Sequence, residues 1–378
     1  MNRFCERCER VTADGHLWCE RPDCPAEQGF PVFVYGDYLG DLKITKLIRV
    51  WRTAALYEAL RGKETVLLKV AHKGDDCEER LKREAVALAS LVSKPLPPVA
   101  FVQSYFPSPR PILPVPLPPY PVPSSRPYGE LSYRGETKFF TVFQHAQGKI
   151  LSDLLLENPQ MWHYQVAWIT VTVAEALRPL AAGNRCHLCL SPDMILVDVD
   201  KEGILRPLIF DLGFLLTGNE IESVYEWQKL CEPGYTAPEL LTKRPKSVTP
   251  AADVYSLGSI FFEMLSGQTA FDSKLLRDEQ IREAVTQHRG NPPVERPELE
   301  HAGVVKVVEQ ALAATGRHNN VIELAKALIA VYGRPPAEKR PYPPRMYVLL
   351  ISLAILLVAT LGVAAFILLQ ILLRRPAA

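Results

Sequence analysis

The sequence of 378 residues predicts an α+β fold with a small cysteine-rich segment at its N-terminal end and a single membrane-spanning helix at its C-terminal end. Three observations support this prediction. Apolar runs typical of strands alternate with longer helical runs between residues 36 and 332. Four cysteines fall within residues 1–30, and an uncharged apolar run extends from Met346 to Leu373.

The charge balance disfavours one broad class of partner. The chain carries 43 basic and 42 acidic residues, for a formal net charge of +1. A nucleic-acid-binding surface needs an excess of basic side chains. We therefore expect no nucleic acid among the partners.

The N-terminal segment, residues 1–30, holds Cys5, Cys8, Cys19 and Cys24 in "CERC" and "CERPDC". Two cysteine pairs at this spacing are typical of a zinc ribbon, because four thiolates close a tetrahedron around Zn²⁺. So short a segment has almost no core, and bound metal would supply its folding energy. Two disulfides are the alternative in an oxidising compartment. His16 is a possible substitute ligand.

A proline-rich insertion covers residues 95–127, where 13 of 33 residues are Pro. Such a run is incompatible with a helix or a central strand and is expected to be extended, in polyproline II geometry. It is either a semi-rigid surface insertion or a docking site for a partner with an aromatic groove.

The C-terminal residues predict a membrane anchor. Residues 347–373 exceed the roughly 20 apolar residues that span a bilayer, and the Pro-rich, basic linker 333–346 precedes them. This linker carries Arg334, Lys339, Arg340 and Arg345, while only two arginines follow the apolar run. The positive-inside rule then places the N-terminal domains in the cytosol, with membrane lipid as a partner of the helix.

Five segments between these ends carry charged residues inside apolar patterns. They are "ETVLLKVAH" with Lys69, "CEERLKREAVALASL" with Glu84, "LIFDLGF" with Asp211, "EPGYTAPELL" with Glu239 and "ADVYSLGSIFFEML" with Asp253. In this order, from about Tyr38 to Val331, they resemble the eukaryotic-type protein kinase superfamily, and especially the bacterial membrane-anchored Ser/Thr kinases.

The resemblance implies a two-lobed fold for residues 36–332, with an antiparallel β small lobe and a mainly helical large lobe. It also implies that Lys69 and Glu84 form the ion pair that holds the α and β phosphates of ATP, and that Asp211 binds Mg²⁺. Gln144, His145 and Ala146 would form the hinge between the lobes. Asp253 would be buried, and Arg317 is the candidate partner of Glu239.

The phosphate-binding loop departs from the family pattern. Its three glycines fall on Arg49, Trp51 and Ala54. Glycines let backbone N–H groups approach phosphates, so bulky side chains here are expected to block that cradle. Trp51 would either fill the nucleotide site or pack as a surface aromatic.

The catalytic loop, "RCHLCLSPDMILVDVD", departs further. His187 remains, but Cys189 stands at the catalytic Asp position, Ser191 at the Lys position and Met194 at the metal-binding Asn position. General-base help of the kind the Asp gives is worth about 10² to 10⁴ in rate, and a thioether is a poor ligand for Mg²⁺. The resemblance supplies no confident catalytic residue.

Several nearby residues allow weaker interpretations. Asp193 could reach inward as a replacement carboxylate. Cys189 is expected to act as a small buried hydrophobe. The scattered Cys77, Cys186 and Cys231 are expected to be inert in a reducing cytosol.

Three functional hypotheses follow. The first is a membrane-tethered pseudokinase that binds ATP weakly or not at all and serves a cytosolic protein as a signalling scaffold or allosteric partner. The second is an atypical ATP-dependent protein Ser/Thr kinase that uses Asp211 and Lys69. The third is a zinc-dependent adaptor in which the kinase-like region is a spacer.

Overall fold

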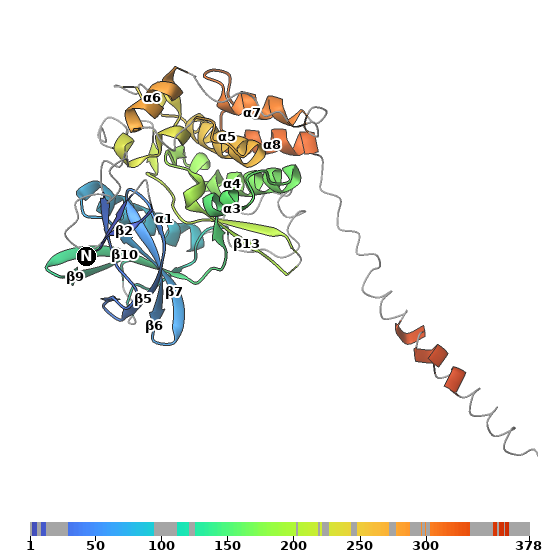
Figure 1. Ribbon diagram of the computed structural model, residues 1–378, viewed down its shortest axis with the longest axis horizontal. Helices are drawn as coiled ribbons and strands as arrows, with labels where there is room; N and C mark the ends of the chain where they lie inside the picture. The colour runs from blue at the N-terminus through green and yellow to red at the C-terminus, as the bar shows by residue number, and fades with distance from the viewer. Residues whose placement is uncertain are drawn as a thin grey trace, which may run out of the picture. The chain divides into compact units, whose positions relative to one another are not determined.

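The computed structural model describes residues 2–5, 9–12, 29–93, 112–120, 125–201, 203–217, 220, 227–242, 248–271, 277–287, 296, 299, 303–332, 351–353, 355–358 and 360–362. The chain divides into two compact units, Met1–Gly333 and Arg334–Ala378. The first unit has a β-rich small lobe and a mainly helical large lobe (Figure 1). The predicted α+β, kinase-like fold is therefore confirmed.

The small lobe is built on a seven-stranded antiparallel sheet (Figure 1). The strand order is β4-β5-β6-β7-β10-β8, and β9 also pairs with β10. The strands are β4 (Tyr38–Leu39), β5 (Leu42–Val50), β6 (Ala54–Arg61), β7 (Glu64–Ala71), β8 (Pro116–Leu117), β9 (Gly129–Tyr133) and β10 (Glu136–Gln144).

Helix α1 (Asp75–Ser93) packs against this sheet through β7 and β10. Its first turn carries Asp75, Asp76 and Glu78, which complement the positive end of the helix dipole. Every residue of β7 from Val66 to Ala71 is buried, and this includes the charged side chain of Lys69. The helix and the strand thus bring Glu84 and Lys69 to one buried place.

The proline-rich insertion contributes an edge strand. Pro116 and Leu117 form β8 opposite Phe143 and Val142 of β10. A proline is tolerated there because an edge strand leaves one row of N–H groups without a strand partner. Residues 95–111 and 121–124 of the insertion lie outside the described residues.

A second, three-stranded antiparallel sheet packs on the small lobe. It has the order β2-β1-β3, with β1 (Asn2–Cys5), β2 (Val11–Thr12) and β3 (Gly29–Val32). Phe4, Phe30 and Val32 share one apolar core with Ile44 and other residues of the larger sheet. The described strands of the N-terminal segment therefore share a hydrophobic core with the small lobe.

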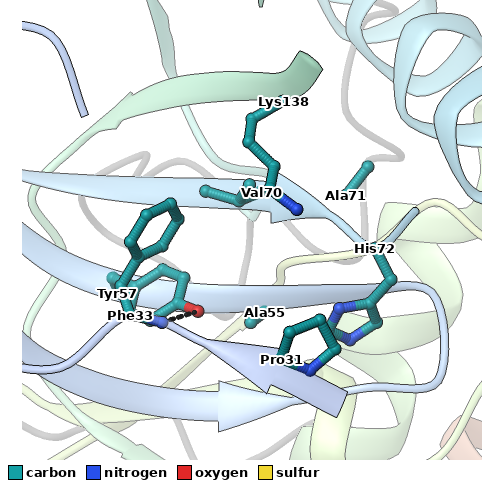
Figure 2. A pocket seen from close by; sticks show the side chains of 8 residues that line it. All are labelled: Pro31, Phe33, Ala55, Tyr57, Val70, Ala71, His72 and Lys138. Atoms are coloured by element: carbon teal, nitrogen blue, oxygen red, sulfur yellow. Dashed lines mark hydrogen bonds between the residues drawn. The ribbon is translucent and has the colours of Figure 1, made fainter. Parts of the chain in front are cut away.

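Figure 2 shows this junction from close by. Pro31 and Phe33 lie beside Tyr57 and His72, around a cavity of about 10 Å³, the size of one water molecule. The Phe33 N–H donates to the Tyr57 hydroxyl at 3.1 Å. The His72 ring stacks on Phe30 with ring centres 4.5 Å apart.

The large lobe consists of helices around α5 (Ala251–Ser266), which is buried along most of its length. Small residues let these helices approach closely, since a Cβ on Gly258 of α5 would lie 2.7 Å from the Ala311 Cβ. The other helices are α3 (Leu151–Glu157), α4 (His163–Ala182), α6 (Asp278–Thr286), α7 (Val304–Leu312) and α8 (Val321–Tyr332).

Short strands and turns carry the loops that face the small lobe. One small sheet has the order β11-β13-β14, and β12 pairs with β15. These strands are β11 (Lys149–Ile150), β12 (Arg185–Cys186), β13 (Ile195–Val199), β14 (Leu205–Ile209) and β15 (Leu216–Thr217). The predicted catalytic loop begins with β12, and Asp211 lies two residues after the end of β14.

The second unit is described at residues 351–353, 355–358 and 360–362, which are helical. Within the described part of the chain, no helix has both the length and the apolarity needed to cross a bilayer. Most of the predicted span 347–373 lies outside the described residues.

The predicted zinc site is likewise only partly covered. Cys5 lies buried at the end of β1, while Cys8, His16, Cys19 and Cys24 lie outside the described residues. The described residues contain no group of three or more His, Cys, Asp or Glu side chains that could hold a metal ion.

Candidate functional site

Four charged side chains meet in the buried centre between the lobes. The Lys69 Nζ donates to Glu84 Oε2 and, at 2.8 Å, to Asp211 Oδ2. The Arg80 guanidinium donates to Asp211 Oδ1 and to the Gly213 carbonyl. The structure thus brings together the predicted Lys69, Glu84 and Asp211, and adds Arg80 from the turn of α1 that precedes Glu84.

The positive and negative charges within this cluster balance each other. All four residues are at most 5% exposed, and two cations face two carboxylates. Burial alone would raise the pKa of Asp211, but Arg80 and Lys69 hold it well below its usual range. Asp211 is therefore a carboxylate whose two oxygens already have cationic partners.

His187 contacts the backbone of the segment that carries Asp211. The His187 ring Nε2 lies 2.7 Å from the Asp211 carbonyl, and the Phe214 N–H donates to the His187 carbonyl at 2.9 Å. Asp253 accepts the backbone N–H groups of His187 and Leu188 at 2.8 and 2.9 Å. Burial raises the pKa of Asp253 to about 6, although these two hydrogen bonds act against the rise.

Cys189 is not a simple buried hydrophobe, and this corrects the expectation from the sequence. It forms a disulfide with Cys231, 42 residues further along the chain. Cys231 follows the 3₁₀ turn η3 (Trp227–Leu230) in the activation segment. Cys231 is therefore not an isolated, inert thiol, because the bond ties the position of the catalytic Asp to the segment that would present a substrate. Cys77 and Cys186 are buried free thiols.

The other catalytic-loop positions also lack reacting groups. Ser191 and Met194 are buried, at 1% and 5% exposure. Asp193 does not reach inward as a replacement for the lost carboxylate. It accepts the Ser152 hydroxyl at 2.5 Å and lies 3.6 Å from Arg49, on the side of α3.

Trp51 occupies the turn between β5 and β6, where the family has phosphate-binding glycines. Its side chain is buried, with the Lys69 Nζ 5.2 Å from the ring centre. The indole Nε1 donates to the Asp193 carbonyl at 3.1 Å. Of the two interpretations left open by the sequence, the structure favours the one in which Trp51 fills the nucleotide side of the cleft.

Two arginines fasten the same turn to the large lobe. Arg52 donates to both carboxylate oxygens of Asp278, at 2.5 and 3.1 Å, to Glu232 at 3.0 Å and to the Lys229 carbonyl at 3.0 Å. Arg49 donates to Glu9 at 3.0 Å and to Asp153 at 2.6 Å. The turn is thus held against the activation segment, α6 and α3.

The hinge residues border an open cavity. Gln144 ends β10, and His145 and Ala146 continue toward β11. His145 and Ala146 line a cavity of about 230 Å³ together with the apolar side chains of Ile48, Leu56, Leu67, Leu196 and Phe210.

The remaining predicted residues lie in the large lobe. Arg317 donates to Glu239 Oε2 at 2.5 Å and to the Ala251 carbonyl at 3.1 Å. These contacts join the end of the activation segment to the start of α5, which is a structural role.

The side chains of this site are poorly suited to bind Mg²⁺ together with a nucleoside triphosphate. Asp211 Oδ2 accepts from Lys69, and Oδ1 accepts from Arg80 and, at 2.7 Å, from the Gly213 N–H. A magnesium ion on this carboxylate would have to compete with two buried cations for its oxygens. Met194 offers a buried thioether at the second metal position. Trp51 covers the lysine that would meet the phosphates.

Sequence reasoning missed Arg80, Arg52, Asp278 and the Cys189–Cys231 bond. A signal existed for Arg80, because residues four apart on a helix share a face and Arg80 precedes Glu84 by that spacing. Arg52 and Asp278 are separated by 226 residues, and no local pattern joins them.

Comparison with known proteins agrees with this architecture. The model of the protein kinase domain matches residues 130–331, which is more than half of the chain. The serine/threonine-protein kinase drp72 of Corynebacterium efficiens is 27% identical over 55% of this chain and 38% of its own length.

Two animal proteins show similar identity over shorter regions. The TBC domain-containing protein kinase-like protein of Mus musculus is 28% identical over 39% of this chain and 17% of its own length. Serine/threonine-protein kinase H2 of Homo sapiens is 30% identical over 38% of this chain and 36% of its own length. The chain therefore spans about two fifths or less of the length of these relatives.

Proposed function

Because this chain belongs to the protein kinase family, we propose that it is a membrane-tethered pseudokinase that serves a cytosolic protein as a signalling scaffold or allosteric partner. Its cleft is built to hold a fixed shape rather than to transfer phosphate. The observation that carries the proposal is the state of Asp211, whose two carboxylate oxygens are bound by Lys69 and Arg80.

The loss of the catalytic base supports the same proposal. Neither a disulfide sulfur nor a reduced thiol at position 189 supplies the carboxylate that would accept a proton from an incoming hydroxyl. Arg52 and Trp51 also hold the β5–β6 turn against the activation segment and the catalytic loop, where a phosphate donor and its acceptor would have to meet.

The direct test is transfer of labelled γ-phosphate. The full chain, purified in nanodiscs, is incubated with ATP and Mg²⁺ or Mn²⁺, and its own phosphorylation and that of added proteins are measured. We expect no transfer above the level of the Asp211→Asn variant. Transfer that Asp211→Asn abolishes would overturn the proposal.

One observation favours the alternative, an atypical protein Ser/Thr kinase that uses Asp211 and Lys69. The Lys69–Glu84 pair is formed, and Arg80 Nη1 is buried with no hydrogen-bond partner among the described residues. An anionic oxygen would satisfy that donor. In the phosphotransfer assay, this alternative requires activity that survives Cys189→Ala and is lost in Asp211→Asn.

The membrane tether rests on the apolar composition of residues 347–373 and the basic linker before them. We expect the full chain to resist extraction by high salt and carbonate and to dissolve in detergent. Protease added outside intact cells should leave residues 1–333 uncut. Cleavage of that region under these conditions would contradict the cytosolic orientation.

A structural zinc ion held by Cys5, Cys8, Cys19 and Cys24 belongs to the same proposal. Cys5 ends β1, and the hairpin closes on it, with the Cys5 N–H donating to the Arg10 carbonyl at 2.9 Å and the Glu9 N–H to the Cys5 carbonyl at 3.0 Å. Metal analysis should find one zinc per chain. Capture of the protein partner after the metal is stripped would count against the adaptor hypothesis.

A further inference from the structure

The Cys189–Cys231 bond joins two backbone segments that are fixed in different ways. On one side, the Cys189 N–H donates to His187 Nδ1 at 3.3 Å. Asp253, on the buried helix α5, accepts the neighbouring Leu188 N–H at 2.9 Å. The catalytic loop is therefore anchored in the interior of the large lobe.

The segment that carries Cys231 is held by side chains instead. Cys231 follows η3, a 3₁₀ turn of 4 residues. Arg52 of the small lobe donates to the Lys229 carbonyl and to the Glu232 carboxylate, each at 3.0 Å. A short turn held in this way can move without unfolding a regular helix or sheet, so its opening costs less free energy than global unfolding.

The surroundings of the two sulfurs suit the reduced state as well as the bond. The Cys189 Sγ lies 3.7 Å from the Leu230 carbonyl oxygen, and the Cys231 Sγ lies 3.3 Å from the Leu188 carbonyl oxygen. A thiol is a weak hydrogen-bond donor. Once the bond is reduced, each S–H therefore has a carbonyl acceptor close to its present position. A pair of buried thiols is thus compatible with the same fold.

The proposed cytosolic orientation makes a permanent bond unexpected. Stable disulfides are rare in cytosolic proteins, and those that form there are usually redox-sensing or catalytic. Cys189 and Cys231 are only 3% and 1% exposed, so a soluble thiol reaches the bond only when the segment around η3 moves. Reduction of the bond and movement of the activation segment are therefore coupled.

We propose that Cys189 and Cys231 form a reversible redox switch, in which the bond fixes the activation segment to the catalytic loop and its reduction releases that segment. The oxidant is hydrogen peroxide. One thiolate breaks the O–O bond, giving a sulfenic acid and a hydroxide that takes up the released thiol proton as water. The second thiol then displaces the sulfenic oxygen as a second water. Two molecules of glutathione reopen the bond by exchange and leave as glutathione disulfide. The inference rests on the proposed cytosolic orientation and adds a control of the surface offered to a partner.

The first test measures whether the bond is reversible in the folded chain. The full chain in nanodiscs is equilibrated in a glutathione buffer with the reduced form in large excess, and then treated with hydrogen peroxide. Free thiols are alkylated at each stage and located by peptide mapping. We expect the bond to open in the first step and to form again in the second. A bond that persists in reduced glutathione, or that peroxide does not restore, would overturn the inference.

Hydrogen exchange measures whether the bond holds the activation segment. We expect the amides of residues 227–232 to exchange roughly tenfold faster or more after reduction. The difference should vanish in Cys231→Ser and remain in Cys186→Ala, which removes a buried free thiol three residues before Cys189. Equal exchange in the oxidised and reduced unmodified chain would overturn the inference, and this comparison needs no variant to fold.

Failure of the switch and failure of the proposed function are distinguishable. Phosphate transfer in either oxidation state would remove the pseudokinase proposal, and external proteolysis of residues 1–333 would remove the cytosolic orientation. Peptide mapping and hydrogen exchange on the purified chain decide the switch separately from both. A bond that glutathione does not open would remove only the switch.

Discussion

Gly213 fixes how closely the segment after Asp211 approaches the His187 segment. Its φ is +67°, and a Cβ at this position would lie 2.0 Å from the His187 carbonyl oxygen. The clashing atom belongs to the backbone of His187, so it cannot move aside as the end of a flexible side chain could. Gly213 therefore holds the geometry that lets Phe214 bond to the His187 carbonyl.

This predicts a large cost for one added methyl group. Gly213→Ala should lower the free energy of unfolding by about 3 kcal/mol or more, because left-handed strain and a backbone clash act together. Gly62→Ala is the matched control, since φ there is +62° with nothing within 4 Å of the added Cβ. It should cost about 1–2 kcal/mol, and chemical denaturation measures both; equal losses would show that the clash is relieved.

His72 gives the stability a pH dependence. Burial lowers its pKa from 6.5 to about 4, against the effect of the Trp51 carbonyl, and the Lys138 ammonium lowers it further. Between these values the unfolded chain binds a proton on His72 that the folded chain does not, so stability falls as the pH falls from 6.5 to 4.

Two other buried groups act in the same range. His187 behaves like His72, with burial lowering its pKa to about 4. Asp253 acts in the opposite direction, because its pKa rises from 3.8 to about 6 on folding. We expect His72→Gln to reduce the slope of unfolding free energy against pH by about 1.4 kcal/mol per unit between pH 4 and 6.5. An unchanged slope in urea denaturation across that range would show that His72 is protonated in the fold.

At the scale of elements, the β5–β6 turn is held by Arg52. Arg52→Ala would leave the Asp278 carboxylate, whose side chain is 10% exposed, without its bidentate partner. Removing one member of a buried ion pair typically costs about 3–5 kcal/mol. Hydrogen exchange should accelerate at residues 50–54 and in η3.

Arg61 provides the comparison for this prediction. It lies at the far end of β6 and donates to the Pro118 and Pro119 carbonyls. Arg61→Ala should leave exchange at residues 50–54 unchanged. Equal protection of the turn in both variants would mean that Arg52 does not hold it closed.

The Cys189–Cys231 bond closes a loop between two elements of the large lobe. For a sequence separation of 42 residues, loop-closure entropy predicts a contribution of about 4 kcal/mol, if the bond introduces no distortion. Mild reductant should lower the melting temperature of the unmodified chain but not that of a Cys189→Ser, Cys231→Ser double variant. Peptide mapping without reductant should recover the cross-linked pair, and its absence would contradict the bond.

Local patterns explain which of these elements were predictable. Lys69 lies in an apolar strand and Glu84 on a helix with apolar spacing, so their elements follow from short segments, while their pairing was implied only by the resemblance to kinases. The sequence also indicated that Trp51 replaces a glycine, but both a filled site and a surface position were compatible with it. Cys189 and Cys231, like Arg52 and Asp278, meet only through the assembled tertiary structure, which no periodicity encodes.

At the scale of the whole first unit, side-chain contacts link the N-terminal sheet to the cleft. Phe30 stacks on His72, whose ring contacts the Trp51 carbonyl, and Glu9 pairs with Arg49. If zinc holds residues 1–30 as proposed, removing it with a chelator should lower the melting temperature of the unit as one transition. A separate early transition that leaves hydrogen exchange at residues 50–54 unchanged would show that the two sheets unfold independently.

The shared core of the two sheets has a practical consequence for anyone who expresses only the region that resembles a kinase. A shortened chain that begins at Gly36 loses Phe4, Phe30 and Phe33, and water then reaches the faces of Tyr57 and Ile44 that they covered. Such a fragment should be poorly soluble and prone to self-association. Its failure in the test tube would reflect a cut through the hydrophobic interior rather than any instability of the intact protein.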